Sequence, residues 1–276
     1  MLILISDAFA PDLPKILSSY GKVTDDMGKL PEATVVLVRS KTKVTGEYID
    51  SAPNLKLVVR GGVGLDNIDL NYAAEKGIAV HNTAAASSIA VSELAFTLMI
   101  ALPNHVTKAD NTMHAGQWAK KELKRTELYN KILGIIGLGM IGSELAKRAT
   151  AFGMNVIAYD PFVESSVVAT MKPDLKGVLN NSDYVSLHLP LTDETTGLIN
   201  AEMLKEFKDG AYLINTGRGK TIIEEDVVES LQLLINHALG VVVNRLLSKN
   251  KGTHELMHEL NACWVEAKHK SALYSF

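Results

Sequence analysis

The stretch from Lys131 to Asp160, KILGIIGLGMIGSELAKRATAFGMNVIAYD, constrains the fold of this chain more than any other. An apolar run over 132–136, typical of a buried strand, ends in glycines at GxGxxG spacing: Gly137, Gly139 and Gly142. Apolar residues then recur at helical spacing: Ile141, Leu145, Ala149 and Phe152. A second apolar run over 156–159 ends at Asp160. The pattern predicts a strand, a tight turn, a helix and a second strand.

Each glycine of this turn has a physical reason if the turn binds a dinucleotide. Gly137 permits the tight turn, Gly139 lets a pyrophosphate approach the backbone, and Gly142 lets the helix pack closely on the strand. Met140 and Ile141 begin the helix, whose unpaired N–H groups and positive dipole end would face the phosphates. The alternative reading is a purely structural turn.

Asp160 follows the second strand, eighteen residues after Gly142. An acid at this place binds the adenosine ribose hydroxyls and repels the additional phosphate of NADP. The predicted cofactor is therefore NAD.

Length and charge exclude several classes of protein. A chain of 276 residues is long enough for two domains. With 28 basic and 31 acidic residues and no prominent basic block, nothing indicates binding to nucleic acid or to an anionic membrane. The apolar stretch 94–102 is too short to span a membrane, and a single cysteine, Cys263, fits a reducing cytoplasm. We expect a cytoplasmic protein with a small-molecule partner.

Strands and helices alternate on both sides of the glycine turn. Before it, strands are expected at 2–6, 34–38, 55–59 and 78–81, with helices at 11–20, 70–76 and 89–102. The helix over 89–102 is apolar around most of its circumference, as in a helix buried between domains. After the turn, strands are expected at 183–189, 211–215 and 239–243, with helices at 201–207 and 224–234. Such alternation predicts α/β architecture with parallel sheets, and a cleft between two domains as the ligand site.

Six ordered motifs resemble the D-isomer-specific 2-hydroxyacid dehydrogenases, and most closely their phosphoglycerate dehydrogenase branch. They are the glycine turn, 62–69 (GVGLDNID), 82–94 (from Asn-Thr to Val-Ser-Glu-Leu), 116–118 (GQW), 186–192 (SLHLPLT) and 215–219 (NTGRG). The resemblance implies a doubly wound Rossmann-type NAD domain over 99–276 and a smaller flavodoxin-like α/β substrate domain over 1–98. It also implies a homodimer, since members of the family pair through the cofactor domain.

The same resemblance assigns the chemistry. It implies reversible hydride transfer between NAD and the α-carbon of a 2-hydroxy or 2-keto acid. Arg218 of the NTGRG motif would hold the substrate carboxylate and polarise the carbonyl, because a guanidinium matches a carboxylate bidentately and stays charged. A surface salt bridge is the alternative role for Arg218.

The glycine loop Gly62, Val63 and Gly64 would supply backbone N–H donors to that carboxylate, although it could be only a tight turn. Arg60 lies where the phosphoglycerate branch has a phosphate-binding arginine, whereas Glu75 replaces a basic residue of some members. The substrate could therefore be 3-phosphoglycerate or an unphosphorylated 2-hydroxy acid.

Two further loops match family segments that run along the cofactor. His188 and Pro190 belong to one, and Thr216 and Gly217 to the other. From the residues alone, His188 could equally be a hydrogen-bonded structural histidine.

The C-terminal part departs from the family pattern from about residue 245. The family uses a histidine, held by a glutamate, as proton donor. Here Val242 replaces the aspartate of the landmark strand, and Leu247 stands where the glutamate belongs. His269 is the best-placed candidate donor; His254 and His258, four residues apart, are interpreted as an exposed helix face and no metal site is expected. The alternative function is an NAD-binding sensor or interaction protein that has lost its proton donor.

Overall fold

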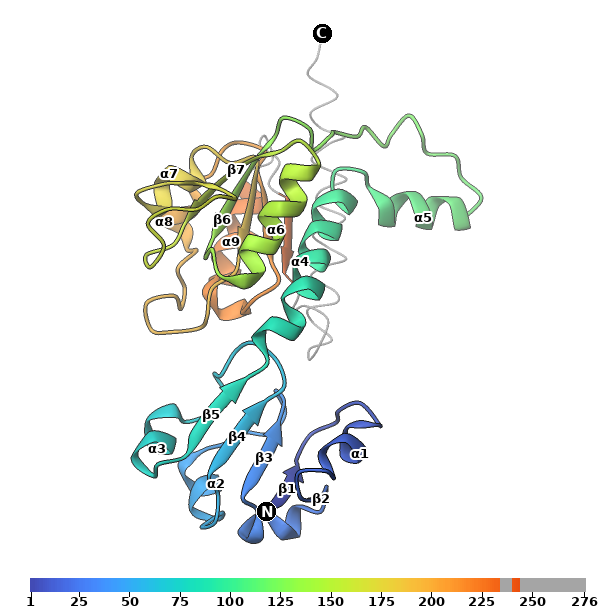
Figure 1. Ribbon diagram of the computed structural model, residues 1–276. Helices are drawn as coiled ribbons and strands as arrows, with labels where there is room; N and C mark the ends of the chain where they lie inside the picture. The colour runs from blue at the N-terminus through green and yellow to red at the C-terminus, as the bar shows by residue number, and fades with distance from the viewer. Residues whose placement is uncertain (234–239, 244–276) are drawn as a thin grey trace. The chain divides into compact units, whose positions relative to one another are not determined.

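The computed structural model describes residues 1–233 and 240–243. The chain divides into two compact units, Met1–Ser88 and Ile89–Phe276 (Figure 1). This division lies earlier in the chain than the boundary expected at 98/99. The reason is that helix α4 (Ala84–Ala101) contributes Ala95, Phe96 and Met99 to a core cluster of the second unit.

The described strands of the first unit form a five-stranded parallel sheet in the order β2-β1-β3-β4-β5, which is the flavodoxin-like order. Alternate residues of its strands enter two different apolar clusters, so both faces are covered. Its elements are β1 (Leu2–Ile5), α1 (Leu13–Leu17), β2 (Lys22–Thr24), the 3-10 helix η1 (Met27–Glu32), β3 (Val35–Val38), α2 (Gly46–Asp50), β4 (Leu57–Arg60), α3 (Leu70–Glu75) and β5 (Ala79–Asn82).

The second unit holds a six-stranded parallel sheet, among the described residues, in the order β11-β10-β9-β6-β7-β8. Its strands are β6 (Ile132–Ile136), β7 (Asn155–Tyr159), β8 (Thr170–Met171), β9 (Tyr184–Leu187), β10 (Tyr212–Asn215) and β11 (Gly240–Val243). Its other helices are α5 (Val106–His114), α6 (Met140–Ala151), α7 (Leu175–Leu179), α8 (Ala201–Leu204), η2 (Gly219–Thr221) and α9 (Glu224–Leu233).

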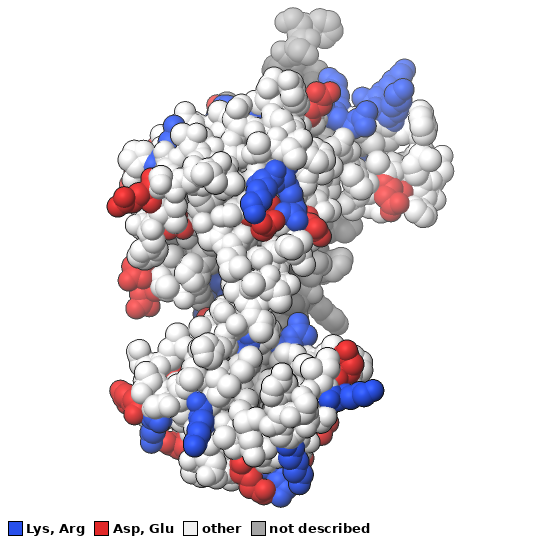
Figure 2. Space-filling view, viewed as in Figure 1, with Lys and Arg blue, Asp and Glu red and all other residues white. Residues whose placement is uncertain are grey.

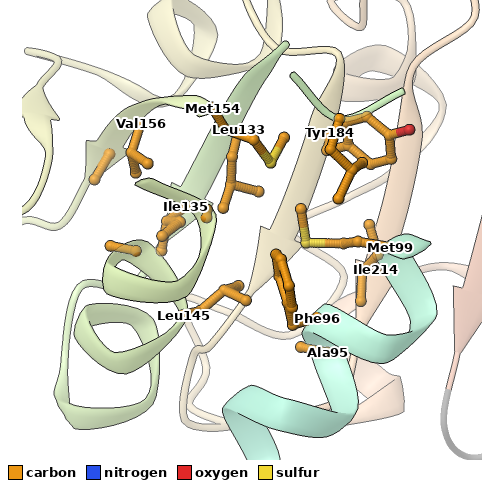
Figure 3. Close-up of a cluster of buried hydrophobic side chains, with 14 of the residues drawn as sticks. Ala95, Phe96, Met99, Leu133, Ile135, Leu145, Met154, Val156, Tyr184 and Ile214 are labelled. Atoms are coloured by element: carbon orange, nitrogen blue, oxygen red, sulfur yellow. The ribbon is translucent and has the colours of Figure 1, made fainter. Parts of the chain in front are cut away.

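Helices cover both faces of this sheet. Leu133 and Ile135 of β6 point to the face covered by α4 and α6, where Met99, Leu145 and Ile214 join them (Figure 3). Ile136, the next residue of β6, belongs instead to the cluster formed with α7, α8 and α9. The predicted doubly wound parallel α/β fold is therefore confirmed.

Helix α4 is more exposed than the sequence suggested. Ala95, Phe96 and Met99 are buried, but Ile89 is 53% and Leu94 39% exposed. Among the described residues, α4 is long and apolar enough to span a membrane by length and composition alone. The apolar stretch 94–102, on which the sequence-based expectation depended, covers only the second half of this helix. The buried stripe of α4 packs against the core cluster of the second unit, as in a helix that covers one face of a sheet.

The inward face of α6 also differs from the expectation. Leu145 and Ala149 are buried as predicted, together with Gly142 and Ala146. Phe152 is 54% exposed and meets the ring of Phe96 edge to face, with centroids 4.7 Å apart. The helix ends at Ala151, so the 3.6-residue period no longer decides where Phe152 points.

Ion pairs cover the outer side of α6. Figure 2 shows basic and acidic side chains side by side there, where Glu144 lies 2.6 Å from Lys147 and 2.9 Å from Arg148. Arg148 also reaches Glu93 of α4 at 3.3 Å and so links the two helices.

Candidate active site

The carboxyl ends of four strands of the second unit lie in register. Ile136 of β6 pairs with Tyr159 of β7 and Leu187 of β9, and Leu187 pairs with Asn215 of β10. The next residue of each strand therefore forms part of one row along the sheet edge: Asp160, Gly137, His188 and Thr216. The chain runs from β6 to β7 on one side and returns to β9 on the other, so this is the switch point at which open α/β sheets bind ligands.

Two glycines of the turn are required by the packing of the protein itself. Gly137 has φ of +91°, and a Cβ there would lie 2.6 Å from the carbonyl oxygen of His188. A Cβ at Gly142 would overlap the carbonyl oxygen of Gly137. The start of α6 can therefore approach the turn only without side chains at these positions.

Gly139 differs, because a Cβ placed there would meet no atom of the described residues within 4 Å, apart from its own neighbours in the chain. The open space in front of Gly139 lies at the N-terminus of α6, for which this glycine is the N-cap and provides no side-chain hydrogen bond. A helix start without a side-chain cap offers N–H donors to an anion. Met140, the first helical residue, is 52% exposed, and Ile141 is half-buried.

The carboxylate of Asp160 is fixed beside this turn. Its Oδ2 accepts the N–H of Leu138 at 2.8 Å, and its Oδ1 accepts the N–H of Phe162 at 2.9 Å. Each carboxylate oxygen has a further lone pair for a ribose hydroxyl. The space at Gly139, the uncapped helix and this oriented acid together fit a dinucleotide without a 2′-phosphate.

His188 and Thr216 both carry a buried polar atom that has no hydrogen-bond partner among residues 1–233 and 240–243: Nδ1 of His188 and Oγ1 of Thr216. The other ring nitrogen of His188, Nε2, lies 3.0 Å from Oγ of the buried Ser186. Burial lowers the pKa of His188 to about 4, so the ring is neutral near pH 7. Buried polar atoms normally have partners, so these two atoms are consistent with a ligand along the row.

The loop after His188 is closed by side-chain hydrogen bonds. Oγ1 of Thr195 donates to the carbonyl of Pro190 at 2.7 Å, and Pro190 itself is exposed. The exposure of Pro190 is consistent with the expectation that the loop runs along the cofactor.

Arg218 follows β10 in a tight turn that leads into η2. Its side chain is half-buried, whereas Gly217 is exposed and donates its N–H to Oδ1 of Asn215 at 3.0 Å. The turn places Arg218 two residues beyond the row that ends at Thr216.

The glycine loop of the first unit follows β4. Gly62 has φ of +143°, and a Cβ there would overlap Nη1 of Arg60, so the guanidinium lies against this loop. The N–H of Gly62 donates to Oγ1 of Thr83 at 3.0 Å. Among the described residues, the N–H groups of Val63 and Gly64 take part in no backbone–backbone hydrogen bond of this loop.

Sequence reasoning missed Thr83, Ser186, Asn215 and Thr221 as parts of these loops. Thr83, Ser186 and Asn215 could have been found, because each lies within a quoted motif, whereas Thr221 lies outside them. His269, His254, His258 and Leu247 lie outside the described residues.

The family model described as the NAD binding domain of D-isomer specific 2-hydroxyacid dehydrogenases matches residues 96–257. The chain belongs to the D-isomer specific 2-hydroxyacid dehydrogenase family. The predicted family and the predicted cofactor, NAD, are thereby confirmed, and the second unit contains the NAD-binding domain of these oxidoreductases.

Several members of the family are similar to this one. A hydroxypyruvate reductase of Thermotoga maritima is 46% identical over 217 residues, which cover 79% of this chain and 71% of the relative. A D-3-phosphoglycerate dehydrogenase of Methanocaldococcus jannaschii is 41% identical over 242 residues, covering 83% of this chain but only 46% of the relative. The chain thus spans less than half of that phosphoglycerate dehydrogenase.

Solved structures of dehydrogenases also have folds similar to that of this chain. The D-lactate dehydrogenase of Aquifex aeolicus, complexed with NAD and lactic acid, has a TM-score of 0.80 and 29% identity, covering 94% of this chain and 85% of its own. The NAD-bound 3-phosphoglycerate dehydrogenase of Entamoeba histolytica has a TM-score of 0.75 and 28% identity, covering 92% and 83%.

Proposed function

We propose that this dehydrogenase interconverts a D-2-hydroxy acid and its 2-keto acid, and that Arg218 binds the substrate carboxylate. The observation that carries the proposal is the position of Arg218 in the turn after β10, next to the row of residues suited to NAD. Bound NAD supplies or accepts the hydride at the substrate α-carbon. Arg218 orients the acid and polarises its carbonyl, because its planar guanidinium can donate two parallel hydrogen bonds.

The first unit is proposed to bind the substrate through the loop at 62–64. The N–H groups of Val63 and Gly64 would donate to an anionic oxygen, and Arg60 beside Gly62 adds positive charge. Because of Arg60, 3-phosphoglycerate is a candidate substrate alongside unphosphorylated acids such as hydroxypyruvate. Comparing kcat/KM for 3-phosphohydroxypyruvate and hydroxypyruvate in the native protein and in Arg60→Gln separates them, since only a phosphate-dependent preference is lost in the variant.

The proton donor is proposed to be His269. His188 is unsuited to this task, because its pKa of about 4 keeps the ring unprotonated at neutral pH. A cofactor-binding protein without turnover, the alternative function, is the outcome expected if His269 does not serve.

A binding and a turnover measurement test the proposal together. NADH binding is followed by fluorescence, and NADH oxidation is followed with hydroxypyruvate, 3-phosphohydroxypyruvate, oxaloacetate and 2-ketoglutarate between pH 5.5 and 9. For the acid that turns over, Arg218→Ala should lower kcat/KM by about a hundredfold or more, which corresponds to about 3 kcal/mol, while NADH affinity is retained. Arg148→Ala, which removes a guanidinium from the end of α6, is the matched control. Undiminished activity in Arg218→Ala would refute the assignment.

We further propose that the protein is cytoplasmic, as its single cysteine indicates, and that it forms a homodimer, as its family implies. Light scattering on the purified chain measures the mass, and a monomer at micromolar concentration would contradict the proposal.

A further inference from the structure

The carbonyl oxygen of Arg218 is the centre of a small hydrogen-bond network. It accepts Oγ1 of Thr221 at 2.7 Å, the N–H of Thr221 at 3.1 Å and Nδ2 of Asn215 at 3.1 Å. Two of these donors are side chains. The backbone of Arg218 is therefore held on the inner side of the turn by residues on both sides of it in sequence.

Both side chains are buried and fully engaged. Asn215 is 2% and Thr221 1% exposed. Besides its bond to Arg218, Nδ2 of Asn215 donates to Oγ1 of Thr221 at 3.2 Å, and Oδ1 accepts the N–H of Gly217 at 3.0 Å. A buried amide and a buried hydroxyl would be costly without partners, and here the hydrogen bonds named above are all directed at the turn that carries Arg218.

The network is anchored to the rest of the second unit. Asn215 is the last residue of β10 and pairs with Leu187 of β9. The carbonyl of Thr221 accepts the N–H of Ile199 at 3.0 Å. The turn is thus fixed at both ends, while Gly217 at its apex is exposed.

We propose that Asn215 and Thr221 are positioning residues for Arg218. They hold the backbone that carries the Arg218 side chain, and so preorganise the guanidinium for a substrate carboxylate without contacting the substrate themselves. This inference rests on the proposed role of Arg218. Preorganisation matters because a small displacement of a bidentate donor weakens both of its hydrogen bonds at once.

The test uses the full chain, NADH and oxalate, a small carboxylate that resembles a 2-keto acid. Thr221→Val removes the hydroxyl at nearly constant volume, Thr221→Ser keeps it, and Asn215→Asp replaces the amide donor by an acceptor. We expect Thr221→Val and Asn215→Asp to raise the Kd of oxalate for the NADH complex at least tenfold, with the Kd of NADH changed less than twofold. Thr221→Ser should keep the Kd of oxalate within threefold of the native value. Such recovery by the retained hydroxyl would not be expected if Thr221→Val acted only by lowering the general stability.

A double variant decides whether the effect passes through Arg218. In an Arg218→Ala background, Thr221→Val should cause no further loss of oxalate affinity. An equal loss in both backgrounds would overturn the inference, as would native oxalate binding in Thr221→Val when Arg218→Ala has lost it. If Arg218→Ala itself binds oxalate normally, or if the native NADH complex binds none, the proposed function fails first and the inference with it.

Discussion

The three glycines of the turn have different physical roles, although the sequence motif treats them alike. Gly137 and Gly142 are required by contacts within the protein, whereas a Cβ at Gly139 would meet nothing within 4 Å in the part of the chain that the structure describes. That space is consistent with a ligand rather than with packing. Single substitutions can therefore separate stability from cofactor binding.

Gly139→Ala should leave the melting temperature nearly unchanged and raise the Kd of NADH at least tenfold, because its methyl group enters the space proposed for the pyrophosphate. Gly142→Ala should instead destabilise the second unit by about 1–3 kcal/mol through overlap with the carbonyl of Gly137. Thermal unfolding and NADH fluorescence measure both effects. The opposite assignment of the two phenotypes would contradict this division of roles.

His188 predicts how stability changes with pH. Its pKa is lowered to about 4 by burial, whereas the unfolded chain binds a proton near the ordinary value of 6.5. The unfolded state therefore holds more protons between these two values, so the free energy of unfolding falls as the pH drops from about 6.5 to about 4. Because the residue as a whole is only partly buried, solvent reduces the effect, and we expect the free energy of unfolding to fall by about 1–2 kcal/mol over this pH range.

Urea unfolding at several pH values checks this slope. His188→Gln, which cannot titrate, should lose the corresponding part of the pH dependence. An identical slope in the variant and the native protein would show that other groups cause it.

The site residues differ in how far the sequence could predict them. The glycines and Asp160 were predictable, because their spacing along the chain determines their role. Thr221 was not, because its role depends on the fold of the turn that returns its hydroxyl to the carbonyl of Arg218. The hydrogen bond between Ser186 and His188 could not be predicted either, because it depends on the direction of the His188 side chain after the end of β9.

At the level of elements, the apolar strands of both sheets were predicted even where they have only four residues, whereas the nine-residue helix α5 and several short elements were missed. The elements β2, α2, β8 and α7 have two to five residues each, too few for a period to be read. Helix α4 was recognised, but its uniform apolarity hid which side faces the core. Only tertiary packing distinguishes its buried stripe from its exposed one.

This asymmetry of α4 can be measured. Met99 is fully buried among side chains of the second unit (Figure 3), so Met99→Ala should reduce the free energy of unfolding by about 2–5 kcal/mol. Leu94 on the same helix is 39% exposed, and Leu94→Ala should cost less than about 1 kcal/mol. Equal losses in urea unfolding would mean that Leu94 is covered by another part of the protein or by a second copy.

At the level of the whole molecule, each unit has its own sheet and its own apolar clusters. The first unit has clusters on both faces of β1, β3 and β4, and the second has clusters on both faces of β6, β9 and β10. Each unit thus satisfies the usual requirement for folding as a separate domain. The residues proposed to contact NAD all belong to the second unit.

NADH should therefore stabilise the two units unequally. At about a hundred times its Kd, a ligand that binds only the folded state adds about 2.7 kcal/mol to the free energy of unfolding of the unit that holds it. Hydrogen exchange measured by mass spectrometry should show slower exchange in β6, β7, β9 and β10, and unchanged exchange of the slowest amides in β1, β3 and β4. The Gly139→Ala protein, with NADH at the same concentration, is the control and should show little change in either unit. Equal protection of both sheets would mean that the units unfold as one cooperative body, because binding energy delivered to one sheet would then be shared by the other.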